Sequence, residues 1–284
     1  MKPVTQMKPV TQMERVSAHG LLILAVMLCL IPVYWMVRSS LTTNSGIFDS
    51  HFQPWLVNFH WHNFVAAWSS QPFALFFFNS IASNMILVAC QLVTSALAAY
   101  SLVFVHFRGK QVLFFFVLLA MMIPLQATFI PIYSMLSDVH LINTYGALIL
   151  PFVGSAFGIF LLRQGFSAIP QEMVRAARID GASEYRILWS IVLPHAKPSL
   201  VTLFLLNFVY HYNSLFWPLV ATNSTNMRVI PVALAYFLSQ DAGQGLQWNL
   251  MMAADLFSVV PVVLLFLLGQ RYFVQGIMST SLKG

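Results

Sequence analysis

The chain has 284 residues, of which 59% are hydrophobic and only 8% are charged, and its formal net charge is +6. An average soluble domain contains roughly 25% charged residues, so this chain has too few charges to cover the surface of a soluble protein of its length. The composition excludes a soluble globular protein and predicts a chain embedded in a lipid bilayer. Because Cys29 and Cys90 both lie in apolar runs, no disulfide framework is expected.

The N-terminal segment, residues 1–17, is predicted to be cytoplasmic. Residues 7–12 repeat residues 1–6 exactly, a duplication that we leave out of the fold analysis. The first apolar run, 18–37, is longer than the apolar part of a typical signal peptide and lacks a persuasive small-x-small cleavage site. It is therefore expected to remain as a membrane helix.

Five more apolar runs follow the first. A hydrocarbon core of about 30 Å requires about 20 helical residues, and each run approaches or exceeds this length. The sequence thus predicts an all-α membrane protein with a transmembrane domain over residues 18–274, a cytoplasmic tail over 275–284, and six spans at 18–37, 79–103, 112–135, 144–162, 200–221 and 250–274. Prolines at 124, 131, 151 and 261 lie in or beside spans, where each could kink a helix.

The basic residues orient these spans. With six spans and both termini in the cytoplasm, only Arg38 and Arg228 of the 14 lysines and arginines fall outside. Such a bias towards the cytoplasmic side is typical of membrane proteins. The positive charge therefore indicates membrane orientation and not a nucleic-acid partner.

The outer segment after the first span contains His51, His60 and His62, with Asp49 as the only nearby carboxylate. A His-x-His pair can bind a metal, but this set lacks a nearby cysteine. We favour chance polar residues in a hydrated loop and predict no metal site.

The cytoplasmic loop 163–199 is polar and rich in small residues, unlike the rest of the chain. Pro170 suits the first turn of a helix, and Glu172 suits its positive end. Gly181 permits a sharp turn, and Ser183 can cap a second helix. This pattern predicts a short helix–turn–helix that docks into a partner's groove. An ordinary amphipathic connector, or a helix lying on the lipid surface, is the alternative.

This loop resembles the EAA loop of ABC importer permeases, the membrane subunits that dock onto a separate ATPase. The resemblance extends over nearly the whole chain and is closest to the carbohydrate-type permeases. Segments similar to that family are 78–80, 99–100, 107–109, 122–126, 130–133, 160–164, 217–219, 252–254 and 270–276.

The resemblance implies the type I ABC importer permease fold, with a cytoplasmic coupling helix, in a bacterial inner membrane. It implies a second homologous permease, two ATPase subunits, an external or periplasmic solute-binding protein and a sugar or sugar-like substrate as partners. The chain has no Gly-x-x-x-x-Gly-Lys-Ser/Thr segment, so ATP and Mg²⁺ are expected on the ATPase and no cofactor on this chain. The residues implied in ATPase coupling are Glu172, Arg175, Ala176, Ala177, Asp180, Gly181, Leu193 and Pro194.

One position departs from the family pattern. Arg175 stands before Ala176 and Ala177 where the family usually has glutamate. Glu172 lies one helical turn earlier and could substitute for it, or the partner ATPase could present an acidic residue to Arg175. Both explanations remain open at this stage.

Asn213, Trp217 and Asp255 are the candidate substrate-pathway residues. The spacing of Asn213 and Trp217 places them on one face of the fifth predicted span, although Trp217 could instead be an interface anchor. Asp255 is the only acidic residue in a predicted span. An intramembrane carboxylate is a functional candidate, with a position at the water interface or a paired carboxylate as the alternative.

A stand-alone secondary transporter or channel is the alternative function. It should have more buried ionisable groups or an inverted repeat, and the sequence displays neither. Oligosaccharides, sugar-like osmolytes and glycerol phosphates all remain open as substrates.

Overall fold

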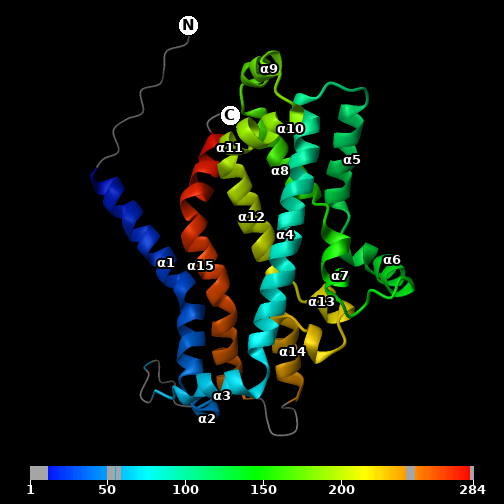
Figure 1. The fold of residues 1–284 in the computed structure, drawn as a ribbon. Coiled ribbons are helices and arrows are strands. Elements are labelled where there is room, and N and C mark those ends of the chain that lie inside the picture. The colour runs from blue at the N-terminus through cyan, green and yellow to red at the C-terminus, as the bar shows by residue number, and fades with distance from the viewer. Residues whose placement is uncertain (1–11, 50–54, 56–58, 241–246, 282–284) are drawn as a thin grey trace. The chain divides into compact units, whose positions relative to one another are not determined.

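The structure, a computed structural model, describes residues 12–49, 55, 59–240 and 247–281. All regular secondary structure within these residues is helical (Figure 1). The chain divides into two compact units, residues 1–71 with 241–257 and residues 72–240 with 258–284. Helix α15 (Trp248–Ser281) begins in the first unit and continues into the second.

The first unit contains α1 (Gln12–Ser40), α2 (Asn44–Ile47), α3 (His62–Ser70) and the start of α15. The side chains of residues 18–35 in α1 are exposed although they are mostly apolar, as expected of a helix that faces lipid. Asn63 fastens the turn after α1 to α3, because its amide donates to the carbonyls of Ser40 and Thr42, both at 2.9 Å. The Asn249 amide in turn donates to Asn63 Oδ1 at 3.2 Å.

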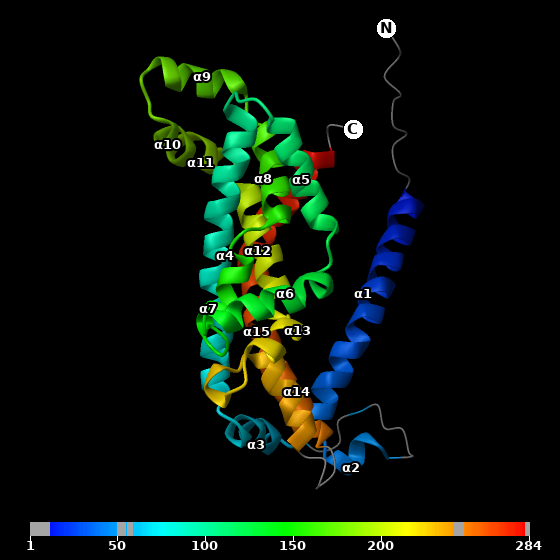
Figure 2. The ribbon, with the colours of Figure 1, turned by 90° about the vertical axis from the view of Figure 1, so that its right-hand side faces the viewer.

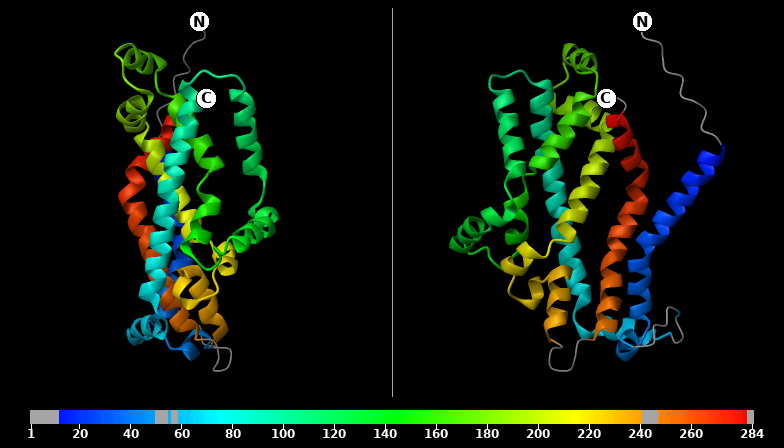
Figure 3. Two further views of the ribbon diagram at one scale, coloured as in Figure 1. Left: turned by 45° about the vertical axis from the view of Figure 1, so that its right-hand side comes forward. Right: turned by 180° about the vertical axis from the view of Figure 1, so that it is seen from behind.

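The second unit is built around α4 (Phe73–Phe104), which packs against α8 (Ala156–Ser167) and α12 (Lys197–Tyr212) (Figures 1 and 3). Gly158 permits the close approach of α8 to α4, since a Cβ at this position would overlap Ser95 Oγ. The remaining helical segments are α5 (Lys110–Met122), α6 (Leu125–Asp138), α7 (Tyr145–Ile149), η1 (Leu150–Phe152), α9 (Gln171–Ile179), α10 (Glu184–Ile187), the π-helical η2 (Leu188–Val192), α11 (Leu193–His195), α13 (Phe216–Ala221), η3 (Thr225–Met227) and α14 (Ile230–Gln240).

Three predicted spans, 18–37, 79–103 and 250–274, lie within the single helices α1, α4 and α15. Ser17–Ser40, Phe73–Phe104 and Trp248–Arg271 are each long and apolar enough to cross a membrane. The other candidates among the described residues are three helix pairs bent by 96°, 48° and 80°. By length and composition, the described part of the chain thus has three helices that could cross a membrane, or up to six candidate spans if each bent pair is one span.

None of the predicted spans 112–135, 144–162 and 200–221 is a single continuous helix in the structure. The first is broken at Ile123, which is extended because it precedes Pro124, and α5 and α6 meet at 96° (Figure 2). The second bends by 48° between η1 and α8, where Ser155 caps the new helix. The third ends at Tyr212, and residues 213–215 separate α12 from α13, so Asn213 and Trp217 do not share a helix face.

Candidate functional site

Residues 170–196, here called the docking segment, project at the end of the second unit where α4 finishes (Figure 2). Helix α9 begins after the extended Pro170 and has Glu172 in its first turn, next to the positive end of the helix. Its Val174 is buried among Tyr100, Phe104 and Phe166 in the core cluster of this unit. One face of α9 is thereby fixed to the membrane helices.

The opposite face of α9 is exposed. Glu172, Arg175 and Ala176 are exposed, and Ile179 is 86% exposed. The following helix adds Tyr185, which is 72% exposed. The docking segment therefore combines exposed apolar and charged side chains on a firmly held helix.

The turn between α9 and α10 requires a glycine. Gly181 has φ +79, a left-handed conformation that side chains disfavour. Ser183 then caps α10 by accepting a hydrogen bond from the Arg186 amide at 3.4 Å. The helix–turn–helix predicted from Pro170, Gly181 and Ser183 has the local geometry expected of it.

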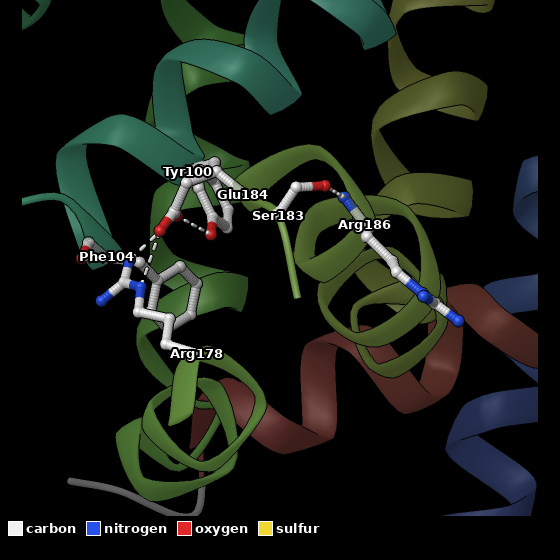
Figure 4. Close-up of polar contacts among 6 residues, drawn as sticks. All are labelled: Tyr100, Phe104, Arg178, Ser183, Glu184 and Arg186. Atoms are coloured by element: carbon white, nitrogen blue, oxygen red, sulfur yellow. Dashed lines mark hydrogen bonds and ion pairs between the residues drawn. The ribbon is translucent and has the colours of Figure 1, made fainter. Parts of the chain in front are cut away.

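A hydrogen-bonded set, here called the clamp, joins this turn to the end of α4 (Figure 4). Arg178 donates to Glu184 Oε1 through Nε at 2.7 Å, and to Glu184 Oε2 at 3.0 Å. Arg178 also donates to the Phe104 carbonyl at 3.0 Å, and the Tyr100 hydroxyl donates to Glu184 Oε2. The hydrogen bond to Glu184 raises the pKa of Arg178 above its ordinary value, although burial opposes it. Arg186 points away from the clamp (Figure 4).

The predicted coupling residues differ in exposure. The exposed ones are Glu172, Arg175, Ala176, Asp180, Gly181 and Pro194. Ala177 and Leu193 are partly buried and pack against the core cluster. Arg175 donates to Gln171 Oε1 at 3.4 Å, one turn earlier in α9. Their role in ATPase coupling stays a prediction.

Tyr100, Arg178 and Glu184 were missed as members of the site. Arg178 and Glu184 have opposite charges on either side of a glycine turn, which was a usable signal. Tyr100 lies in the family-like segment 99–100, but its hydrogen-bond partner Glu184 is 84 residues later in the sequence and meets it only through the fold.

A cavity of about 380 Å³ lies in the second unit between α4, α6, η1, α12 and α13. Its lining residues are Ser80, Ser83, Asn84, Leu87, Ala120, Ile123, Leu125, Thr128, Ile132, Leu148, Pro151, Phe152, Tyr210, His211, Tyr212, Ser214, Trp217, Pro218 and Val229. Trp217 lines it, but its indole N–H donates to the Ala147 carbonyl at 2.9 Å and is thereby occupied. Asn213 is outside the lining set, and Asp255 belongs to the first unit.

Three amide side chains tie α4 to its neighbours beside this cavity. Gln91 donates from Nε2 to the Phe152 carbonyl at 2.7 Å and lies 2.9 Å from His211 Nε2. Gln91 Oε1 accepts from the Asn207 amide at 2.7 Å. Asn84 donates to the Phe208 carbonyl at 2.9 Å. These bonds hold α12 against α4 and pair most of the amide atoms, whereas Asn84 Oδ1 is buried without a hydrogen-bond partner among the described residues.

Of the outer histidines, His51 lies outside the described residues. Among the described residues, no group of three or more His, Cys, Asp or Glu is arranged to hold a metal ion.

Residues 91–279 match the family model described as binding-protein-dependent transport system inner membrane component. This match extends over more than half of the chain and includes the docking segment, the clamp partners on α4 and most of the cavity lining. The chain belongs to this family of transporter permeases.

Two relatives illustrate the family. The sn-glycerol-3-phosphate transport system permease protein UgpE of Yersinia pestis is 31% identical over 94% of this chain and 96% of its own length. The arabinooligosaccharides transport system permease protein AraQ of Halalkalibacterium halodurans is 34% identical over 73% of this chain and 74% of its own.

Solved structures share the fold. A chain of a bacterial ABC transporter involved in the import of the acidic polysaccharide alginate matches with a TM-score of 0.76 at 23% identity, over 94% of this chain and 100% of that one. A chain from the bacterial alginate transporter in complex with its alginate pentasaccharide-bound periplasmic protein matches with a TM-score of 0.62 at 15% identity, over 89% and 92%. The fold is that of an ABC importer permease.

Proposed function

We propose that this protein is a permease subunit of an ATP-driven importer for a sugar or sugar-like solute. It forms half of the translocation pathway together with a second, homologous permease. Two ATPase subunits bind ATP and Mg²⁺, and a periplasmic or external binding protein delivers the solute. The names of the relatives support the solute class, because they include a glycerol phosphate permease and an arabinooligosaccharide permease.

The docking segment is the observation on which this proposal mainly rests. Ile179 and Tyr185 are both more than 70% exposed, and exposed apolar surface rimmed by polar residues can mark a protein–protein interaction site. A short helix with one face anchored and the other free suits insertion into a groove. We propose that the ATPase supplies this groove and contacts Glu172, Arg175 and Ala176.

Helix α4 supplies the mechanical link between the ATPase and the pathway. The clamp holds the docking segment to Tyr100, whereas Asn84 lines the cavity on the same helix. These residues are 16 positions apart, which corresponds to about 24 Å along the helix. A displacement of the docking segment is thereby transmitted to the cavity by an unbroken helix.

The transport cycle requires that ligands bind one conformation of the permease pair more tightly than the other. ATP binding closes the ATPase pair and moves both permeases' docked helices, and the pathway then opens outwards to the binding protein. ATP and the loaded binding protein must each bind this outward-facing state more tightly than the inward-facing one.

The basic residues favour a cytoplasmic docking segment. Twelve of the 14 lysines and arginines, all but Arg38 and Arg228, lie on the same side if both termini are cytoplasmic. We therefore propose that both termini and the docking segment lie on the cytoplasmic side of a bacterial inner membrane, where the docking segment faces the ATPase.

Copurification tests the proposed assembly. The tagged chain, extracted in mild detergent, should bring down an ATPase and a second permease, identified by mass spectrometry. Ala176→Trp, on the exposed face of α9, should lose the ATPase and keep the second permease. Ala74→Trp is the matched control, since Ala74 is also exposed but lies at the opposite end of α4 from the clamp. Recovery of the chain alone, properly folded, would contradict the proposal.

A further inference from the structure

The cavity beside α12 is lined by side chains that carry no fixed charge. Among the described residues that line it, none is Asp, Glu, Lys or Arg, and His211 is the only side chain that could acquire a positive charge. An ion placed in such a cavity would lose its hydration without gaining a counter-charge. The lining therefore disfavours an anionic ligand unless His211 is protonated.

The hydrogen bonds of Gln91 keep His211 neutral. Gln91 Nε2 faces both the Phe152 carbonyl and His211 Nε2, and a flipped amide would place its oxygen against that carbonyl. An amide nitrogen only donates, so His211 Nε2 must accept. A neutral imidazole that accepts through Nε2 has its proton on Nδ1.

Most polar groups of the lining are already occupied within the protein. The Ser83 hydroxyl donates to the Asn79 carbonyl at 2.6 Å, and Ser80 Oγ accepts from the Ile230 amide at 2.7 Å. The Thr128 hydroxyl bonds the Leu125 carbonyl at 3.1 Å. These groups hold the helices together and have little capacity left for a ligand.

Asn84 Oδ1 and Tyr212 Oη of the lining have no hydrogen-bond partner among the described residues, but both atoms are buried. Three further groups near the end of α12 are also unpaired. The hydroxyls of Tyr210 and Ser214 and the Nδ1–H of His211 line the cavity and make no hydrogen bond within the part of the chain that the structure describes. The Tyr210 and His211 rings meet edge to face, with centroids 5.0 Å apart, so the two side chains support each other. One imidazole donor and two hydroxyls match the alternating donors and acceptors of a ligand rich in hydroxyl groups.

We infer that Tyr210, His211 and Ser214 form a subsite for a neutral, hydroxyl-rich solute unit, such as one unit of an uncharged oligosaccharide. The cavity volume lies within the range of roughly 300–1,000 Å³ found for small-molecule sites. Apolar lining that includes Phe152 suits the C–H face of a sugar ring. This inference rests on the proposed importer function and narrows its substrate class: the cavity is not built for a phosphorylated or carboxylated solute.

Equilibrium binding to the purified importer complex, without its binding protein, tests the subsite. The probes are radiolabelled arabinotriose, which is neutral, and sn-glycerol 3-phosphate, which is anionic. We expect arabinotriose to bind at least about tenfold more tightly, because a desolvated anion finds no cation here. Equal or tighter binding of the phosphate, or no binding of either probe, would overturn the assignment.

Two variants separate a ligand contact from a structural role. His211→Gln keeps an acceptor for Gln91 near the Nε2 position but removes the Nδ1 donor, and Ser214→Ala removes a hydroxyl that makes no internal bond. Each should weaken arabinotriose binding about three- to tenfold, the effect of one lost hydrogen bond, and Ser214→Ala should leave the thermal stability unchanged. Tyr133→Phe, in α6 but outside the lining, should stay within about twofold of wild type. Unchanged affinity in both cavity variants would refute the subsite.

ATP-driven uptake into proteoliposomes, measured in parallel with the binding protein present, separates the two levels of the proposal. If wild-type protein shows no ATP-driven uptake of any solute, the importer function itself is wrong. If uptake is normal and both cavity variants bind as wild type, only the subsite is wrong.

Discussion

Removing the Tyr100 hydroxyl measures how much the clamp contributes to the coupling between ATP hydrolysis and solute transport. Tyr100 is buried in the core cluster, so Tyr100→Phe keeps the packing of the ring and deletes one hydrogen bond to Glu184. A hydrogen bond to a charged group contributes about 1.5–3 kcal/mol. The Glu184 side chain is 50% exposed, so water replaces part of the lost interaction. We expect the clamp to lose about 1 kcal/mol of stabilisation, which changes the equilibrium between the clamped and unclamped docking segment about fivefold.

The assay is the number of solute molecules imported per ATP hydrolysed in proteoliposomes that contain the full complex. If the clamp transmits docking-segment movement to α4, Tyr100→Phe should lower this ratio severalfold while ATP hydrolysis continues. Tyr133→Phe, the same chemical change in α6, is the control and should leave the ratio unchanged.

A double-mutant cycle with Glu184→Gln gives the magnitude directly. The two substitutions act on one hydrogen bond, so their effects on stability should be non-additive, with a coupling energy of about 1 kcal/mol. Additive effects within about 0.3 kcal/mol, together with an unchanged transport ratio, would refute the role assigned to the clamp.

Three further substitutions test the docking turn, the helix packing and the docking charge. In a thermal unfolding assay, Gly181→Ala should destabilise the complex by about 1–2 kcal/mol, because Gly181 has a left-handed backbone conformation. The control Gly154→Ala should have little effect, because Gly154 has no positive φ and a Cβ there would meet open space. Gly158→Ala should cost about 1–3 kcal/mol through overpacking against Ser95; adding Ser95→Ala should recover part of that loss, and failure to do so would contradict the packing. Arg175→Glu should weaken ATPase binding by at least about fivefold in a titration, because it reverses an exposed charge at the docking face; unchanged affinity would show that Arg175 makes no productive contact.

Local sequence signals predicted the helix–turn–helix within residues 170–196. Pro170, Gly181 and Ser183 each act through the backbone of their immediate neighbours, and the helix–turn–helix that they predict is the one observed. The long helices α1 and α4 were also predictable from the sequence, because a continuous apolar run of sufficient length indicates a membrane-spanning helix.

Features that depend on tertiary structure could not be predicted from the local sequence. Hydropathy does not detect a bend inside an apolar run, so the 96° break before Pro124 appeared only as a candidate kink. The end of α12 at Tyr212 has no proline or glycine to mark it, and the shared face expected for Asn213 and Trp217 was therefore wrong. The bonds that join the clamp to α4 and the bonds of Gln91 connect residues more than 60 positions apart, and only the fold brings these residues together.

ATP-driven solute uptake by the reconstituted complex tests the central claim most directly. The account predicts that uptake requires hydrolysable ATP and the copurified ATPase, that Ala176→Trp abolishes it, and that Ala74→Trp preserves it. Uptake by this chain alone without ATP, or uptake equally insensitive to both substitutions, would contradict the claim that a separate ATPase drives the permease through the docking segment.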